Sequence, residues 1–364
     1  MKKILLTFFL LFILNGFSQE KKSNYLQLNY FHGKTLLQKN IEHLATGPTG
    51  FLLSWNQRTF GEKKWQQDYN YPDFGFSFGY IDFNNKNLDK LYGLYAHHDF
   101  HLSNRNAAHK FLLSIGAGIA YNTKPYDKIT NNKNISLGSH LNLSPLFKIY
   151  YAKENIIENI GLQTGFTFIH ASNGSSKSPN KGINVYGFNV GLNYNLNSEN
   201  KEFIVFNDKK KYQESIHFNA TILAGVNESD NIDSGAFPFF ILSSYVDKRL
   251  NRKSALQLGV ELHLHYYLRE HIKFQNIFNG NINETNHPDW KRVSLILGHE
   301  LFLNKTSIIT QFGYYVYSPF KQEGNFYERV GVKRYFKNSY FASISIKAHL
   351  YNAEGLEFGF GYRF

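Results

Sequence analysis

The sequence contains no cysteine, so no disulfide bond can hold the fold together and no lipoprotein anchor can form. Proline is scarce, with 8 residues in a chain of 364. Beyond residue 18, no apolar run approaches the roughly 18 residues that a helical membrane span needs. These absences exclude a disulfide-stapled fold and a bundle of transmembrane helices.

The N-terminus has the pattern of a secretory signal. Lys2 and Lys3 precede an apolar run over residues 4–14, and small residues follow where cleavage would occur. The run is too short for a membrane anchor, which is the alternative. We therefore expect residues 1–18 to be a signal peptide and residues 19–364 to form the exported protein.

The formal net charge is +12, which makes nucleic acid one conceivable partner. The basic residues are scattered through turns and alternating positions and do not form one tract. We therefore expect no nucleic-acid binding. If the chain forms an outer-membrane barrel, the phosphorylated lipopolysaccharide is the expected anionic partner at the barrel rim.

Apolar and polar residues alternate through most of the chain, and 17% of the residues are aromatic. A period of two is typical of strands whose two faces meet different solvents. The last run, 356–364, ends on Phe364 and resembles the insertion signal of outer-membrane proteins. The pattern predicts an all-β fold, an antiparallel transmembrane β-barrel of about 14–16 strands in the cell outer membrane. Three further runs show the alternation clearly: 110–121, 215–226 and 256–269.

The sequence offers one candidate domain boundary. Segment 197–213 is the most charged interruption and the best candidate for a boundary, yet it lacks the composition of a flexible linker. A single barrel over residues 19–364 is the first choice. A smaller barrel followed by a second β unit is the alternative.

A polar segment from His170 to Asn184 separates two apolar strands within residues 162–196. Side chains two apart on a strand share a face, so His170 and Ser172 point the same way. That face is the apolar, lipid-facing one, where ionisable groups are costly and usually functional. A base and a hydroxyl facing lipid indicate a hydrolase that acts on lipid. The apolar residues of matching parity are Leu162, Phe166, Phe168, Phe188, Val190, Leu192, Tyr194 and Leu196.

Serine is a weak nucleophile until a base removes its proton. His170 can be that base for Ser172, and the side-chain carbonyl of Asn184 can orient the imidazole. Ester cleavage also needs hydrogen-bond donors for the oxyanion. The available donors are the turn Asn173, Gly174 and Ser175 and the side chain of Asn180.

The pattern H-x-S-N-G-x-x-x-x-P-N-x-G-I over residues 170–183 resembles the lipid A 3-O-deacylases, the PagL family. The resemblance implies an outer-membrane barrel that removes an ester-linked acyl chain from lipid A in the outer leaflet, with no metal or other cofactor. It implies His170 as the base and Ser172 as the nucleophile. It places the oxyanion hole at Asn180 and the backbone amides near Gly174 and Ser175.

Two departures from that family keep alternatives open. The family usually has Glu where this chain has Asn184, and its compact members have about half the strands expected here. Outer-membrane phospholipase A, a calcium-dependent dimer, resembles the chain through its His-Ser-Asn set and H-x-S-N-G motif. The P-N-x-G-I segment favours the deacylase. A calcium requirement would separate these two enzymes, and a conducting channel without esterase activity would indicate a non-catalytic porin or structural barrel.

Two further polar groups have inward parity and could supply metal ligands, but neither is a complete ligand set. We expect them to form hydrogen bonds inside a polar lumen. These groups are His97, Asp99 and His101, and Glu261, His263 and His265.

Overall fold

The structure is a computed structural model. It describes residues 23–36, 43–197, 202–207, 212–229, 232–279, 288–337, 339–350 and 352–364. The expected signal peptide over residues 1–18 lies outside the described residues. No helix in the described ranges is long and apolar enough to cross a membrane.

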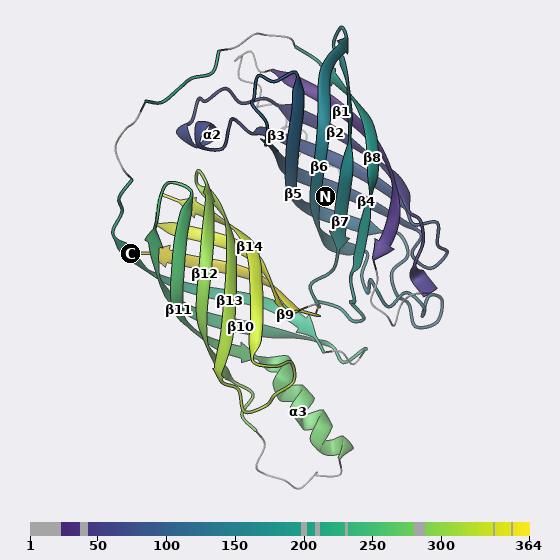
Figure 1. The fold of residues 1–364 in the computed structure, drawn as a ribbon. Helices are drawn as coiled ribbons and strands as arrows, with labels where there is room; N and C mark the ends of the chain where they lie inside the picture. The colour runs from purple at the N-terminus through teal and green to yellow at the C-terminus, as the bar shows by residue number, and fades with distance from the viewer. Residues whose placement is uncertain are drawn as a thin grey trace, which may run out of the picture.

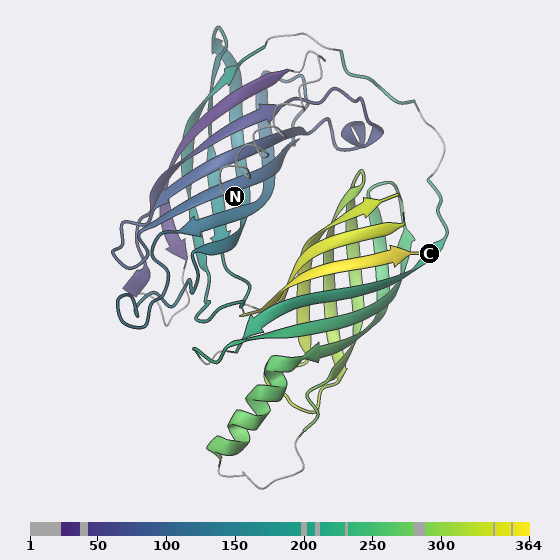
Figure 2. The same ribbon diagram turned by 180° about the vertical axis from the view of Figure 1, so that it is seen from behind.

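The described chain forms two closed antiparallel barrels of eight strands each (Figures 1 and 2). The first contains β1 (Asn24–Leu36), β2 (Thr49–Gln57), β3 (Asp73–Asp82), β4 (Lys90–His101), β5 (His109–Asn122), β6 (Leu141–Ile157), β7 (Ile160–Ala171) and β8 (Ile183–Asn195). The second contains β9 (Ile216–Glu228), β10 (Ala236–Arg249), β11 (Ser254–His265), β12 (Arg292–Leu303), β13 (Thr306–Tyr317), β14 (Phe326–Phe336), β15 (Tyr340–His349) and β16 (Asn352–Arg363). In the described ranges, the helices α2 (Lys64–Asp68) after β2 and α3 (Tyr266–Phe278) after β11 lie outside the walls.

The preference for a single barrel was wrong, whereas the total of 14–16 strands agrees with the 16 strands of the described chain. β1 pairs with β8 from Tyr25↔Asn195 to Leu36↔Asn184, and β16 pairs with β9. Once β1 and β8 satisfy each other's edges, β8 has no free edge for β9. In the sequence, the segment predicted as a boundary, 197–213, falls between β8 and β9, which belong to different barrels.

The alternation places apolar side chains outside and polar side chains inside, as expected. Along β7 and β8, the outward residues Phe166, Phe188 and Leu192 are 61%, 49% and 50% exposed. The inward residues Gln163 and Asn189 are buried. A barrel with this distribution has a lipid-compatible wall and a polar interior.

Polar side chains in the lumen of the first barrel bind one another. His97 Nδ1 lies 3.2 Å from Asp99 Oδ1, and Tyr150 donates its hydroxyl to Asp99 Oδ2 at 2.9 Å. His101 Nε2 lies 3.4 Å from Asp73 Oδ2. These groups are therefore partners in a buried network, as the inward parity of His97, Asp99 and His101 predicted.

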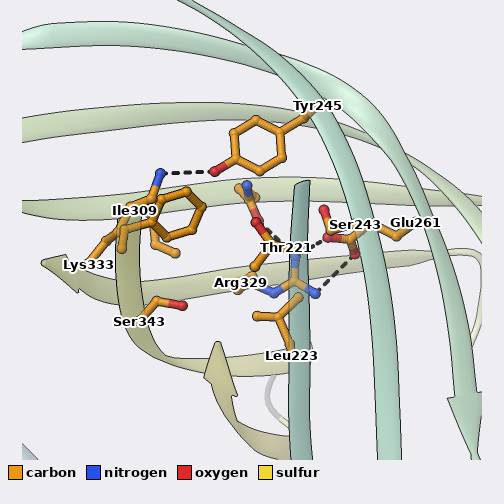
Figure 3. Close-up of a pocket in the computed structure, with 11 residues that line it drawn as sticks. Thr221, Leu223, Ser243, Tyr245, Glu261, Ile309, Arg329, Lys333 and Ser343 are labelled. Atoms are coloured by element: carbon orange, nitrogen blue, oxygen red, sulfur yellow. Dashed lines mark hydrogen bonds and ion pairs between the residues drawn. The ribbon is translucent and has the colours of Figure 1, made fainter. Parts of the chain in front are cut away.

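Ion pairs fill the lumen of the second barrel. Arg329 Nη1 donates to Glu261 Oε1 at 2.7 Å, and Arg329 Nε donates to Glu357 Oε2 at 2.6 Å. Figure 3 shows Arg329 and Glu261 pointing toward each other, while Lys333 donates to the hydroxyl of Tyr245 at 2.9 Å. The cavity that these side chains line has a volume of about 20 Å³, which is room for about one water molecule. The second barrel is therefore packed where this network lies.

We expect Arg329→Ala to destabilise the second barrel by about 3–5 kcal/mol, because it leaves the buried carboxylates of Glu261 and Glu357 without their cation. The measurement is the denaturant midpoint followed by heat-modifiable gel mobility. Arg334→Ala is the control, since Arg334 lies on the same strand with its side chain exposed. Equal midpoints for the two variants would contradict the structural role of Arg329.

Candidate active site

The pairing of β7 with β8 brings His170 and Asn184 together. They are directly opposite in the antiparallel register, so their side chains lie on the same outer face. His170 Nδ1 lies 2.7 Å from Asn184 Oδ1. An amide oxygen only accepts, so Nδ1 carries the proton and Nε2 presents a lone pair. Among the described residues, Nε2 makes no hydrogen bond, and it is therefore free to act as a base.

Gly182 allows the imidazole to occupy this position. Its φ is +69°, and a Cβ built there would lie 2.9 Å from His170 Cε1. Any other residue at 182 would combine an unfavourable backbone conformation with a clash against the imidazole. The close approach of the His170 imidazole therefore explains why the P-N-x-G-I segment has glycine at residue 182 in this chain.

Ser172 is the first residue of the loop between β7 and β8, residues 172–182, which we call the motif loop. Its backbone N–H donates to Leu143 O at 3.1 Å, so the β6–β7 pairing continues one step past β7. Its Oγ accepts hydrogen bonds from Asn180 Nδ2 at 2.8 Å and from the Gly174 N–H at 3.2 Å. Ser172 is 4% exposed, so its hydroxyl is held by two donors and is almost shielded from water.

The motif loop orients both donors. Gly174 and Ser175 have φ values of +61° and +59°, which turn the chain so that the Gly174 N–H faces Ser172. Asn180 Oδ1 accepts the Asn173 N–H at 3.1 Å, and this bond fixes which end of the amide faces the serine. The structure therefore brings two of the predicted donors, Gly174 and Asn180, to Ser172.

Neither Asn173 nor Ser175 donates to Ser172 Oγ in the described chain, and the side chains of both have other partners. Asn173 Nδ2 donates to Lys177 O at 2.8 Å, a bond within the motif loop. Ser175 Oγ donates to Ala353 O in the second barrel. These side chains shape and anchor the loop, while Gly174 and Asn180 face the serine.

The site lies at the end of an apolar stripe on the outer wall. Phe166 and Phe188 pack edge to face with ring centroids 5.7 Å apart, and Tyr186 is 44% exposed beside them. This geometry can support acyl transfer: a base with its orienting partner, a nearby hydroxyl, and two N–H donors. No hydrogen bond joins His170 to Ser172 in the described chain. Such bonds are often formed only when substrate is bound.

A carboxylate–histidine cluster in the second barrel was not predicted. Ligand atoms of Glu323, His349 and Glu354 lie within 4.8 Å of one another. Lys347 and Arg292 already neutralise Glu354 at 2.6 and 3.0 Å. Burial and the neighbouring Glu354 carboxylate raise the pKa of Glu323, which lies in the loop between β13 and β14, to about 7. Because Lys347 and Arg292 already contact Glu354, the cluster is better suited to sharing a proton than to binding a metal ion.

The other inward candidates of the second barrel also have partners. Glu261 pairs with Arg329, and His263 Nε2 lies 2.9 Å from Ser294 Oγ. The ring of His265 stacks on Phe239 with centroids 4.8 Å apart. In the described residues these side chains pack within the lumen and do not converge with His170.

Two family models match the chain. The model described as "Lipid A 3-O-deacylase (PagL)" matches residues 49–193, and "Acyloxyacyl hydrolase, C-terminal domain" matches residues 215–364. The first match covers most of the first barrel, from β2 onward, and the second covers the whole second barrel. The first match contains every residue of the candidate site.

Solved structures with some likeness are outer-membrane proteins. Neisserial surface protein A is 14% identical, with 48% of this chain and 99% of that chain covered and a TM-score of 0.31. The outer membrane enzyme PagL is 19% identical, with 45% and 97% covered and a TM-score of 0.30. No curated protein sequence matches the chain significantly.

Proposed function

Because the chain belongs to the lipid A 3-O-deacylase (PagL) family and lies in the cell outer membrane, we propose that it is a serine esterase that removes an ester-linked acyl chain from lipid A. The observation that carries this proposal is the pairing of His170 Nδ1 with Asn184 Oδ1, at 2.7 Å, on the outer wall two residues before Ser172. A base held in one tautomer on the lipid-facing wall, two residues before a serine hydroxyl that two N–H donors contact, suits hydrolysis of a lipid ester.

The reaction follows from the positions of these groups. His170 Nε2 takes the proton of Ser172 as Oγ bonds to the ester carbonyl carbon. The Gly174 N–H and Asn180 Nδ2, which now donate to Ser172 Oγ, are close enough to stabilise the oxyanion. Collapse of the tetrahedral intermediate breaks the bond between the carbonyl carbon and the leaving oxygen, and this oxygen receives the proton from His170. Water then attacks the acyl-serine by the same route, releasing a fatty acid and restoring Ser172.

The substrate reaches Ser172 by lateral diffusion in the outer leaflet. Its acyl chains lie against the apolar stripe, which includes Phe166 and Phe188. The ester bonds then lie at the height where this stripe ends and the polar motif loop begins. This route requires the motif loop to be on the extracellular side, and it needs no passage through either lumen.

A second candidate is a phospholipase A-like activity, favoured by one observation. The residue that orients His170 is the neutral Asn184, as in the His-Ser-Asn set. The family match over residues 49–193 favours lipid A. The packed lumen of the second barrel disfavours a porin.

The test is mass spectrometry of lipid A incubated with the purified protein in calcium and in EDTA. We expect the mass of one acyl chain to be lost in both conditions, because the mechanism uses no metal. Lipid A from cells that express Ser172→Ala should keep that chain. Unchanged lipid A, together with calcium-dependent release of fatty acid from phospholipid, would replace this proposal with the phospholipase.

A further inference from the structure

We propose that the second barrel braces the motif loop and thereby positions Ser172 and its two donors. The inference rests on the proposed function, because it concerns the same serine. Three segments are involved, and each follows an odd-numbered strand. They are the motif loop after β7, the end of β9 with its turn, and the start of β16, which follows β15. The topology therefore places them at the same end of their barrels, where Figures 1 and 2 show the first barrel's loops beside β9.

The last residue of β9, Glu228, and the residue that follows it, Ser229, make three hydrogen bonds to the motif loop. The Glu228 N–H donates to Ser175 O at 2.8 Å, and Glu228 Oε2 accepts the Ser178 N–H at 2.8 Å. Ser178 Oγ donates to Ser229 O at 2.7 Å. The carboxylate bond is charge-assisted, which makes it the strongest single contact of the three. The loop is therefore held at two separate points, Ser175 and Ser178, by the end of β9.

The start of β16 makes the remaining contacts. Ser175 Oγ donates to Ala353 O, and Leu356 packs against the backbone of Gly174. A Cβ on Gly174 would lie 3.0 Å from Leu356 Cβ and 3.3 Å from its backbone nitrogen. This close approach fixes the peptide whose N–H donates to Ser172.

The braced residues are next to the groups that contact the nucleophile. Gly174 supplies one donor to Ser172 Oγ, and Asn180, two residues after Ser178, supplies the other. A loop held only at its two ends samples several arrangements, and a displacement near 1 Å can reduce a rate on the order of 100-fold. Glu228 therefore acts as a positioning residue, through the loop and without touching substrate.

The first experiment measures steady-state kinetics of Glu228→Ala and Glu228→Gln in the full-length protein. We expect Glu228→Ala to lower kcat about 10- to 100-fold with KM changed by less than about 2-fold, because substrate binding on the apolar stripe is retained. Glu228→Gln keeps one acceptor oxygen and should show a smaller loss. Asp233→Asn is the matched control: it removes another contact between the barrels, an exposed ion pair with Lys128 at 3.4 Å. It should leave kcat unchanged.

A second measurement does not depend on activity. The chain has no native cysteine, so Lys177→Cys carries a single nitroxide on an exposed position of the motif loop. We expect its spectrum to show greater mobility when Glu228→Ala is added, with unchanged heat-modifiable gel mobility as the check of folding. Unchanged kcat and unchanged label mobility would overturn the brace. A protein that cleaves no lipid, yet shows the increased mobility, would refute the proposed function and support the restraint on the loop.

Discussion

Replacing Ser172 with alanine is expected to reduce ester hydrolysis by at least about 10³-fold while both barrels stay folded. Ser172 Oγ is the only hydroxyl in the described chain that receives both the Gly174 N–H and Asn180 Nδ2. Without this oxygen no acyl-serine can form, and the remaining donors can only polarise the ester toward water. The side chain contributes no hydrogen bond that either barrel needs, because β7 continues through the backbone of residue 172.

The measurement is fatty-acid release from lipid A by purified protein, with gel mobility before and after heating as the folding check. Ser139→Ala is a suitable control. Ser139 lies just before β6, at the same end of the first barrel, and its Oγ donates only to Leu141 O. Ser172→Ala with wild-type turnover would exclude Ser172 as the nucleophile.

The second large effect concerns His170 and its partner. His170→Ala removes the base, which we expect to lower turnover by about 10²–10⁴-fold. Asn184→Ala should lower it less, because Asn184 orients the imidazole through one hydrogen bond of 2.7 Å but brings no charge to stabilise the imidazolium. Asn184→Glu should preserve or raise activity, since a carboxylate in that place would do both.

Single-turnover rates of the three variants at one pH would test this order. Equal losses for Asn184→Ala and His170→Ala would contradict it, because Asn184 would then be as important as the base. An inactive Asn184→Glu variant would indicate a site built for the neutral amide, which is the arrangement of the phospholipase.

The sequence predicted the strands and their faces because alternation is a local property. Phe166 and Phe188 face outward and Gln163 faces inward in the structure, as their parity required. Closure is not local. It depends on β1 meeting β8, residues about 160 positions apart along the chain, and a run of hairpins has the same pattern in one large barrel or two small ones. For this reason the strand total could be predicted and the number of barrels could not.

The same distinction applies to the site. His170 and Asn184 flank one loop, so strand parity was enough to predict that their side chains share the outer face. The contacts of Glu228 and Leu356 with that loop join segments from different barrels. Glu228 belongs to no pattern in the sequence, and the alternation over 356–364 predicts the face on which Leu356 lies but not its contact with the loop. The spacing of residues in the sequence also could not predict the loop conformation that directs the Ser175 hydroxyl to Ala353 O.

The even number of strands in the first barrel limits how this architecture could be modified. With eight strands, β9 begins at the end of the molecule where β1 began, so the second barrel is inserted with the same polarity as the first. If the first barrel had an odd number of strands, the second barrel would have the opposite orientation in the membrane. Glu228 would then lie on the other side of the bilayer from Ser178. Strands can therefore be gained or lost here only in hairpin pairs. Adding or removing an even number of strands keeps Glu228 and the motif loop at the same end of the two barrels. An odd number would place them at opposite ends.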